Sequence, residues 1–346
     1  MNILSELQEL GHRISPDVRR PRIGFLGVGW IGLNRMEAML AGSTIDACAI
    51  VEPNPEMQSA ALERAPQAEI VGSLGKLLAL SPDGIVIATP SALHAEQSIA
   101  ALEAGVAVFC QKPLGRNASE VEAVLEAARR NDRLLGVDLS YRFTAGMEQI
   151  RDLVRENAIG HIYAAELVFH NAYGPDKAWF YDPAQSGGGC VIDLGVHLVD
   201  LLLWTLDFPT VTNISSKLFA QGEKLINRLS KVEDYAVATI ELENGLAARL
   251  ACSWRLHAGR DAVISVTFHG TEGSLAFSNV NGSFYDFTAE LRRGTQSEVL
   301  TIPPDAWGGR AAVDWANRLA VSNRFDPQAD ELLKVAEVLD RIYAGS

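Results

Sequence analysis

The sequence predicts an α/β protein in which a doubly wound parallel sheet is followed by an α+β domain with an open, mainly antiparallel sheet. In residues 21–142, apolar runs alternate with helical patterns of about 10–15 residues, which is typical of βαβ units. In residues 143–346, apolar and polar residues alternate along segments joined by short turns, which is typical of antiparallel strands. The length of 346 residues also fits two domains of about 150 residues each, after an N-terminal extension at 1–20.

The expected strands of the first domain are nearly continuous apolar runs, which indicates burial on both faces of the sheet. These strands lie at 22–32, 45–55, 83–90, 106–113 and 133–143. Between them, helical patterns lie at 34–42, 55–65, 74–80, 91–105 and 117–132. In the second domain, helices are expected at 146–157, after the glycines at 187–189, and at 329–345. Its strands are expected at 162–170, 235–242, 246–254, 262–270 and 273–280.

The composition excludes several classes of protein. A net charge of −13 disfavours binding to nucleic acid or to an acidic membrane surface. Residues 1–20 lack the basic and apolar regions of a secretion signal, and no apolar run reaches the roughly 20 residues of a membrane span. We therefore expect a soluble, cytoplasmic protein. The cysteines form no CxxC pair, which favours free thiols over disulfides or a metal site; they are Cys48, Cys110, Cys190 and Cys252.

A G-x-G-x-x-G motif follows the first expected strand and opens the first helix. Its residues are Gly27, Val28, Gly29, Trp30, Ile31 and Gly32. Glu52 lies 20 residues after the last glycine, at the end of the next strand, which completes a dinucleotide-binding fingerprint of the Rossmann type. Gly27 permits the tight turn, Gly29 lets the backbone approach a pyrophosphate, and Gly32 lets the helix pack closely. A purely structural strand–turn–helix unit is the alternative.

The acidic Glu52 favours NAD over NADP, because its carboxylate would accept hydrogen bonds from ribose hydroxyls and repel a 2′-phosphate. A basic residue from elsewhere in the chain could reverse this preference. Ligands of doubly wound sheets lie at the carboxyl ends of the strands. Two expected strands end at Thr89-Pro90 and at Gln111-Lys112, so these residues are expected to border the cofactor.

Lys112 has a position that suits catalysis. A lysine at a strand end, beside a nicotinamide, can polarise a substrate oxygen or help to carry its proton. A solvent-facing lysine is the ordinary alternative, but the end of this strand points into the cofactor crevice.

A second pair of polar residues lies on the helix after the glycines at 187–189. Asp193 and His197 are four residues apart, which predicts that they share one helical face. A histidine can act as a general base that removes a hydroxyl proton during hydride transfer. The alternative is a packed histidine with Asp193 as its partner. Asp200 is a weaker candidate on the same helix, and the glycines are expected to give a flexible entry with room for a ligand.

The ordered set of motifs resembles the glucose-fructose oxidoreductase, inositol dehydrogenase and rhizopine catabolism family, written Gfo/Idh/MocA. The motifs that carry the resemblance are GxGxxG with Glu52, then "ATPSALH", "QKPL", "SYRF", "GGGxxxDLGVHxxD", "VEDYAVATIELENG" and "GTEGSL". They run in the family's order from about residue 21 to the C-terminus.

The resemblance implies a Rossmann domain, a second domain whose open sheet forms a dimer or tetramer interface, and oxidation or reduction of a secondary alcohol in a sugar, inositol or related polyol. The family's lysine then falls on Lys112 and its D-x-x-x-H pair on Asp193 and His197, and Lys112 and His197 form the expected acid/base pair. Its threonine-proline turn falls on Thr89 and Pro90, and the histidine of the following helix falls on His94. The resemblance also implies a cis bond before Pro113.

Three residues depart from the family's pattern. Gln111 replaces the glutamate before the lysine, which predicts less electrostatic support for a protonated Lys112. Ser91 replaces the asparagine after the threonine-proline turn. Ser140 stands where asparagine is common, before Tyr141 and Arg142.

The expected reaction is hydride transfer between a nicotinamide and a carbinol carbon, with His197 as acid/base, Lys112 on the oxygen, and Asp193 orienting His197 or binding a neighbouring hydroxyl. The substrate pocket is expected to include Tyr141, Arg142 and Trp179, with Trp179 stacking on a sugar ring or simply packing. Two alternatives stay open: an NAD-dependent glycosidase that acts by transient oxidation, and a non-catalytic regulator that binds a dinucleotide.

Overall fold

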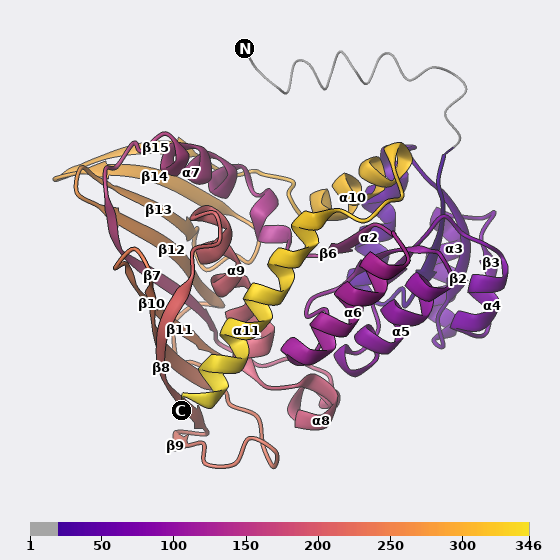
Figure 1. The fold of residues 1–346 in the computed structure, drawn as a ribbon, viewed down its shortest axis with the longest axis horizontal. Helices are drawn as coiled ribbons and strands as arrows, with labels where there is room; N and C mark the ends of the chain where they lie inside the picture. The colour runs from indigo at the N-terminus through magenta and orange to yellow at the C-terminus, as the bar shows by residue number, and fades with distance from the viewer. Residues whose placement is uncertain (1–19, 346) are drawn as a thin grey trace.

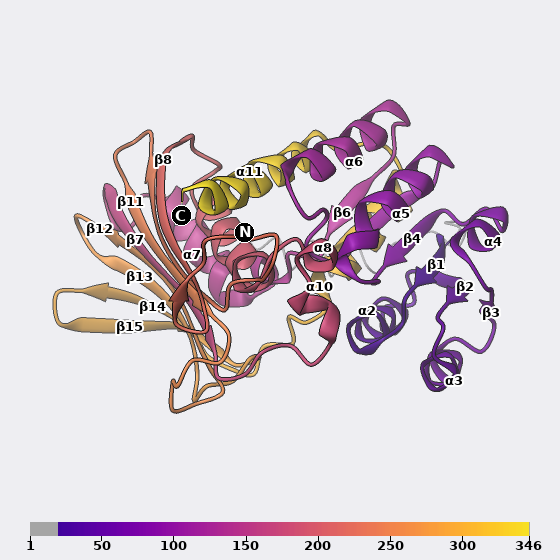
Figure 2. The same ribbon diagram turned by 90° about the horizontal axis from the view of Figure 1, so that it is seen from below.

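A computed structural model of the chain describes residues 20–345 (Figure 1). The predicted N-terminal extension therefore lies almost entirely outside the described residues. Two sheets form the framework, and Figures 1 and 2 show them at opposite ends of the molecule with helices between and around them.

The first sheet is the predicted Rossmann sheet. Its strands all run parallel, in the order β3-β2-β1-β4-β5-β6. Their bounds are β1 Arg22–Leu26, β2 Asp46–Val51, β3 Glu69–Ile70, β4 Gly84–Ile87, β5 Ala107–Cys110 and β6 Leu135–Val137. The crossover helices are α2 Trp30–Ala41, α3 Pro55–Arg64, α4 Leu74–Ala79, α5 Ser91–Glu103 and α6 Ala118–Arg130. Every residue of β4 and β5 is buried, because helices cover both faces of the sheet.

The last of these strands is shorter than the sequence predicts. We expected an extended segment at 133–143, but β6 ends at Val137 and Ser140–Phe143 forms a 3₁₀ turn. The chain turns there because the Leu139 amide bonds the carbonyl of Val137. The Asp138 side chain faces two buried partners, Gln111 directly after β5 and Arg35 on α2.

The second sheet is open and mainly antiparallel, as predicted. Its order is β15-β14-β13-β12-β7-β11-β10-β8-β9, and only the pair β7 and β11 is parallel. The strands are β7 Ile162–Asn171, β8 Val211–Ala220, β9 Glu223–Lys224, β10 Tyr235–Leu242, β11 Ala247–Ser253, β12 Ala262–Gly270, β13 Ser274–Asn279, β14 Phe287–Arg293 and β15 Gln296–Thr301. Burial alternates along β10 and β12, because one face packs on helices and the other faces outward.

Helices from the same half of the chain cover the inner face of this sheet (Figure 2). They are α7 Ala145–Arg155, α9 Val196–Thr205 and α11 Glu331–Ala344, which contact β13, β7 and β8 respectively. The run Pro183–Thr205 is long and apolar enough for a membrane span by composition, but 89% of its most apolar window is buried. This burial is typical of a core helix of a folded protein.

The C-terminal part of the chain returns to the first domain. Helix α10 (Arg310–Val321) packs on α2 and β5, and its Trp315 belongs to the same core as Ile23 and Phe25 of β1. The Trp315 ring also lies against Gly84 and Gly136, where no side chain could fit beside it. The sequence-based boundary at 143 assigned α10 to the second domain, whereas its side chains complete the first.

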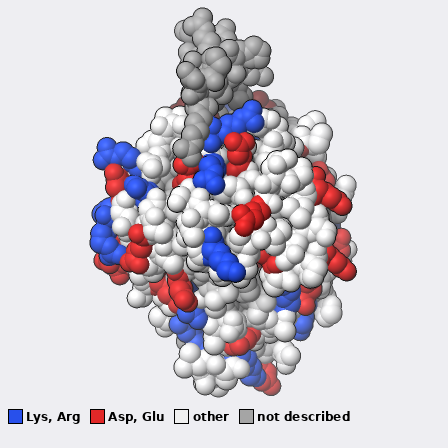
Figure 3. All heavy atoms as spheres, turned by 90° about the vertical axis from the view of Figure 1, so that its right-hand side faces the viewer, with Lys and Arg blue, Asp and Glu red and all other residues white. Residues whose placement is uncertain are grey.

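Charged side chains of both signs are mixed on the Rossmann end of the molecule. On the face drawn in Figure 3, acidic and basic groups are interspersed, and the described residues of that face form no continuous basic patch.

Replacing Trp315 with alanine should destabilise the protein by about 3–5 kcal/mol, because it removes a fully buried aromatic side chain from the first core. Chemical denaturation measures this loss. Val321→Ala on the same helix is the control, since Val321 is 88% exposed and its change should stay within about 0.5 kcal/mol. Equal effects of the two substitutions would contradict the placement of α10 in the core.

Candidate active site

A cavity of about 790 Å³ lies between the carboxyl ends of the Rossmann strands and the second domain. It brings together most of the residues that the sequence singled out: Gly29, Trp30, Ile31, Thr89, Pro90, His94, Gln111, Lys112, Tyr141, Trp179, Asp193 and His197. Gly27, Val28, Gly32, Glu52 and Arg142 do not line it. The first four of these support the glycine turn or lie beside it, while Arg142 has a different role, described below.

The glycine turn has the geometry of a phosphate-binding turn. Gly27 has φ +85°, and a Cβ there would lie 2.6 Å from the carbonyl oxygen of Ala88. A Cβ at Gly32 would overlap the backbone of Gly27, so close packing of α2 requires glycine. A Cβ at Gly29 would meet nothing within 4 Å, so open space lies in front of the helix N-terminus. An open N-terminus of this kind fits a pyrophosphate, and the residues present therefore fit a bound dinucleotide.

Glu52 stands at the end of β2 and is joined to the same turn. Its carboxylate accepts hydrogen bonds from the amide of Val28 at 2.9 Å and from the amide of Asn54 at 3.0 Å. The side chain is half-buried, so part of the carboxylate faces solvent beside the turn. These contacts hold the acidic group close to the predicted position of a ribose.

His94 links the ends of β4 and β5. Its Nδ1 lies 2.7 Å from the carbonyl of Pro113 and its Nε2 lies 2.7 Å from the carbonyl of Thr89. A neutral imidazole can donate only one of these two hydrogen bonds. Burial lowers the pKa of His94, and the nearby charge of Lys112 lowers it further. The Lys112–Pro113 peptide bond is cis, as the family resemblance implied.

Lys112 reaches across from β5 to the second domain. Its Nζ donates to the Asp193 carboxylate at 2.7 Å and to the Asp193 carbonyl oxygen at 2.8 Å. The other carboxylate oxygen of Asp193 accepts a hydrogen bond from Trp254 Nε1 at 3.0 Å. Lys112 is therefore largely buried at the edge of the cavity and is held by the Asp193 carboxylate, so it is not a solvent-facing charge.

The predicted shared face of Asp193 and His197 is altered by a π-helical segment. Val191–Gly195 is π-helical and α9 begins only at Val196, so Asp193 does not precede His197 by one regular α-turn. Within the described residues, no hydrogen bond joins Asp193 to His197. The carboxylate serves Lys112 and Trp254 instead, and the predicted orientation of His197 by Asp193 stays without support in the geometry.

His197 is buried beside Tyr141. The two rings meet edge to face with centroids 4.8 Å apart, and the His197 Nδ1 has no hydrogen-bond partner within the described part of the chain. Burial holds the pKa of His197 well below its ordinary value, and the positive charges of Lys112 and Arg35 lower it further. His197 is therefore neutral at neutral pH, which is the form that can accept a proton.

Gln111 belongs to a buried polar network that the sequence did not predict. Its Nε2 donates to Asp138 at 2.5 Å, and Arg35 Nε donates to the same oxygen of Asp138 at 2.6 Å. All three side chains are buried and line the cavity. The amide of Gln111 thus supports Asp138, while Lys112 takes its carboxylate from Asp193.

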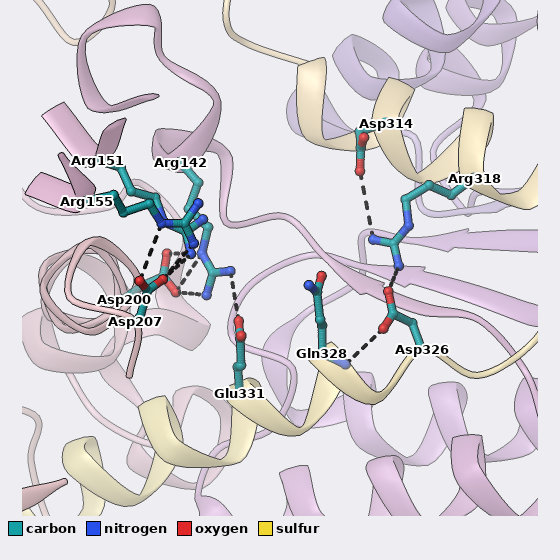
Figure 4. A network of polar contacts seen from close by, with 10 residues as sticks. All are labelled: Arg142, Arg151, Arg155, Asp200, Asp207, Asp314, Arg318, Asp326, Gln328 and Glu331. Carbon is teal, nitrogen blue, oxygen red and sulfur yellow. Dashed lines mark hydrogen bonds and ion pairs between the residues drawn. The ribbon is translucent and has the colours of Figure 1, made fainter. Parts of the chain in front are cut away.

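Arg142 lies away from the cavity, contrary to the sequence-based prediction. It forms a bidentate ion pair with Asp200 of α9, with Nε–Oδ2 at 2.9 Å, and a longer contact of 3.6 Å to Glu331 of α11 (Figure 4). Its guanidinium also lies over the ring of Phe208. Arg142 therefore ties the 3₁₀ turn to the helices of the second domain, and Asp200 is its partner and not a site residue.

Aromatic side chains form the outer wall of the cavity. Trp179 lines it and stacks on Phe180, with ring centroids 3.8 Å apart. The wall continues with residues that the sequence analysis missed: Tyr173, Phe284, Tyr285 and Trp307. They come from loops far apart in the sequence, so only the fold brings them together. Arg35, one turn after Gly32, did carry a positional signal, whereas Asp138 lay inside the expected strand at 133–143 and follows the end of β6 only in the structure.

The fold and the cavity define a two-domain dinucleotide-binding protein whose second domain closes the site. The chain belongs to the Gfo/Idh/MocA family: residues 21–139 match "Oxidoreductase family, NAD-binding Rossmann fold", and residues 147–276 match "GFO/IDH/MocA C-terminal domain".

Individual relatives agree with this membership. The chain is 27% identical over 236 residues to the D-glucoside 3-dehydrogenase of Escherichia coli (strain K12), which covers 65% of this chain and 65% of that relative. The alignment thus spans slightly less than two thirds of the relative's length. A levoglucosan dehydrogenase complexed with NADH has a TM-score of 0.80 at 23% identity, covering 94% of this chain and 97% of that one. KijD10, a 3-ketoreductase from Actinomadura kijaniata complexed with NADP and TDP-benzene, has a TM-score of 0.80 at 21% identity, covering 94% and 98%. These two likenesses concern the fold.

Replacing Gly29 with alanine should weaken NADH binding by about tenfold or more, because the added methyl occupies the open space before the N-terminus of α2. Fluorescence titration with NADH measures the change. The melting temperature should hold, since the methyl meets no protein atom within 4 Å. Gly72→Ala is the matched control, because Gly72 also has open space and lies outside the cavity. Unchanged NADH binding in Gly29→Ala would contradict the predicted cofactor position.

Proposed function

We propose that this chain is an NAD-dependent oxidoreductase that transfers a hydride to or from a secondary alcohol carbon of a sugar, inositol or related polyol. The observation that carries the proposal is the arrangement of Lys112, Asp193 and His197 in one cavity with the glycine turn at Gly29. Relatives named D-glucoside 3-dehydrogenase and inositol 2-dehydrogenase support the substrate class.

The chain's own groups divide the work on the substrate oxygen. Lys112 has three N–H donors, and two of them are directed at Asp193, which leaves one for a substrate hydroxyl. His197 in its neutral form takes the hydroxyl proton during oxidation and returns it during reduction. Burial makes His197 a weak base, and Lys112 offsets this by stabilising the developing alkoxide. A bound nicotinamide supplies the hydride acceptor or donor.

NAD is proposed over NADP because of the acidic group beside the turn. Glu52 is held there by the amides of Val28 and Asn54, and the residues of α3 before Arg64 include no lysine or arginine. Arg64 itself pairs with Glu37 at 2.6 Å. A 2′-phosphate would therefore meet a carboxylate, and neither β2 nor α3 offers a basic side chain that is free of an acidic partner.

Assembly through the open sheet is proposed as well. The outward face of this nine-stranded sheet is covered by no helix among the described residues. Its surroundings include Glu166 and Arg249, whose charges are of opposite sign. A second copy of the chain would cover this face, as a dimer or a tetramer, and light scattering measures its presence.

Replacing Lys112 with alanine should lower the turnover number by about 10²–10³-fold, because it removes the donor to the substrate oxygen. NADH binding should persist, since the glycine turn and Glu52 are untouched. The assay follows NADH absorbance with polyols, aldoses, inositols and sugar acids as substrates. Lys76→Ala is the control, as Lys76 is exposed on α4 and remote from the cavity.

The same assay separates the competing functions. Cleavage of an aryl glycoside without net change in NADH absorbance would show an NAD-dependent glycosidase. NADH binding without turnover of any of these substrates by the wild-type chain would favour the non-catalytic regulator.

The pH dependence of alcohol oxidation follows from His197. An ordinary histidine is half protonated near pH 6.5, so an ordinary catalytic histidine would lose activity below that pH. Since burial lowers the pKa of His197, its neutral form persists to lower pH, and kcat/KM should stay level from about pH 8 to pH 6. A drop centred near pH 6.5 that disappears in His197→Asn would contradict this environment for His197.

A further inference from the structure

The pairing of Lys112 with Asp193 depends on the backbone as well as on the side chain. Lys112 Nζ bonds the carbonyl oxygen of Asp193 at 2.8 Å in addition to its carboxylate. Asp193 lies in the π-helical segment Val191–Gly195, directly after the glycines at 187–189. A small rotation of this segment would move both acceptors away from Lys112. Something outside the segment must therefore fix it.

Glu233 binds the start of this segment through several hydrogen bonds. Its side chain is buried, with 1% of the residue exposed, just before β10. One carboxylate oxygen accepts hydrogen bonds from the amides of Gly189 and Val191, both at 2.9 Å. The backbone carbonyl of Glu233 accepts the amide of Cys190 at 3.1 Å. Three successive amides at the start of the segment are thus bound by one residue.

Tyr343 completes this arrangement from α11. Its hydroxyl donates to the same oxygen of Glu233 at 2.8 Å. α11 runs beside α9 across the inner face of the second sheet (Figure 1), so the C-terminal helix reaches the segment that carries Asp193. The contacts of Glu233 and Tyr343 with 189–191 are called the carboxylate clamp below.

The glycines before the segment fit tightly against the clamp. A Cβ at Gly189 would overlap the backbone carbonyl of Glu233, and a Cβ at Gly188 would overlap the hydroxyl of Tyr343. The sequence suggested that these glycines give a flexible entry. The structure shows instead that they allow close approach to a buried carboxylate.

We propose that Glu233 and Tyr343 are positioning residues that fix the π-helical segment and so hold Asp193 against Lys112. Neither residue lines the cavity, so each acts through the segment and not on the substrate. Burying a carboxylate is costly unless donors surround it, and three donors meet a single oxygen of Glu233 here. These three hydrogen bonds hold the Glu233 carboxylate in one position relative to residues 189–191 and α11. The role in turnover rests on the proposed function, whereas the positioning of Lys112 does not.

The test uses Tyr343→Phe, which removes one hydroxyl, and the pair Glu233→Gln and Glu233→Ala. We expect kcat to fall by about tenfold to a hundredfold, because displacement of a catalytic group by about 1 Å has an effect of that size. NADH binding should be unchanged, and Glu233→Gln should retain more activity than Glu233→Ala, since the glutamine keeps an acceptor oxygen. Tyr163→Phe, at an exposed position of β7 outside the cavity, is the control.

A second measurement needs no turnover. The Lys112 amine is held by the carboxylate and carbonyl oxygens of Asp193, and its side chain is only 21% accessible. Release from Asp193 should therefore expose the amine to a reagent and speed its acylation. We expect N-hydroxysuccinimidyl acetate to modify Lys112 faster, relative to the exposed Lys76, in Tyr343→Phe and Glu233→Gln than in the wild type. Peptide mass spectrometry measures the ratio.

The two measurements separate the possible failures. Unchanged relative acylation of Lys112 in all three clamp variants would overturn the positioning role. Loss of NADH binding together with a fall in the melting temperature would also overturn it, because the clamp would then be a contact that the whole fold needs. Faster acylation in a wild-type chain that turns over no substrate would leave the clamp supported and refute the proposed function alone.

Discussion

The contact between Lys112 and Asp193 is the interaction on which the rest of the site depends. Lys112 follows β5 at the carboxyl edge of the first sheet, and Asp193 belongs to the helical segment that packs on the second. The pair therefore fixes where the second domain meets the cofactor crevice. Because each partner is only partly exposed, with 21% and 15% of the side chains accessible, water screens the attraction less than at an open surface. A site assembled from two domains needs such a contact, since neither domain alone carries both the lysine and its carboxylate.

Local sequence predicted those parts of the molecule that local chemistry determines. The glycine turn and Glu52 could be recognised because a strand, a tight turn and a helix N-terminus all lie within one short stretch. The position of Lys112 followed from the rule that parallel strands present their carboxyl ends at one edge. The alternation of apolar and polar residues likewise indicated the second sheet. That alternation could not predict the order of the strands or the parallel pairing of β7 with β11, because pairing between distant segments leaves no local signal in the sequence.

The remaining features arise from contacts between distant segments. Trp254 lies 61 residues from its partner Asp193 in the chain. Glu233 lies 44 residues from its partner Gly189, at the start of the Asp193 segment. We expected Arg142 in the pocket because it follows Tyr141. The two residues lie on a 3₁₀ turn, so their side chains point in different directions, and Arg142 pairs with Asp200 outside the cavity. The spacing of Asp193 and His197 assumed a regular helix. The π-helical segment changes the rotation between them, so the carboxylate meets Lys112 and the imidazole meets Tyr141.

Gln111 illustrates how a departure from a motif can be explained only by its neighbours. Considered alone, an amide in place of a carboxylate before Lys112 suggests a weaker field for the lysine. In the folded chain the amide donates to Asp138 at 2.5 Å, and Arg35 donates to the same carboxylate oxygen. A glutamate at this position would set two buried carboxylates against each other with one arginine between them, which is unfavourable in a medium of low polarity. The amide is thus the group that suits a carboxylate at Asp138, while the carboxylate that Lys112 requires is supplied by Asp193 from the other domain.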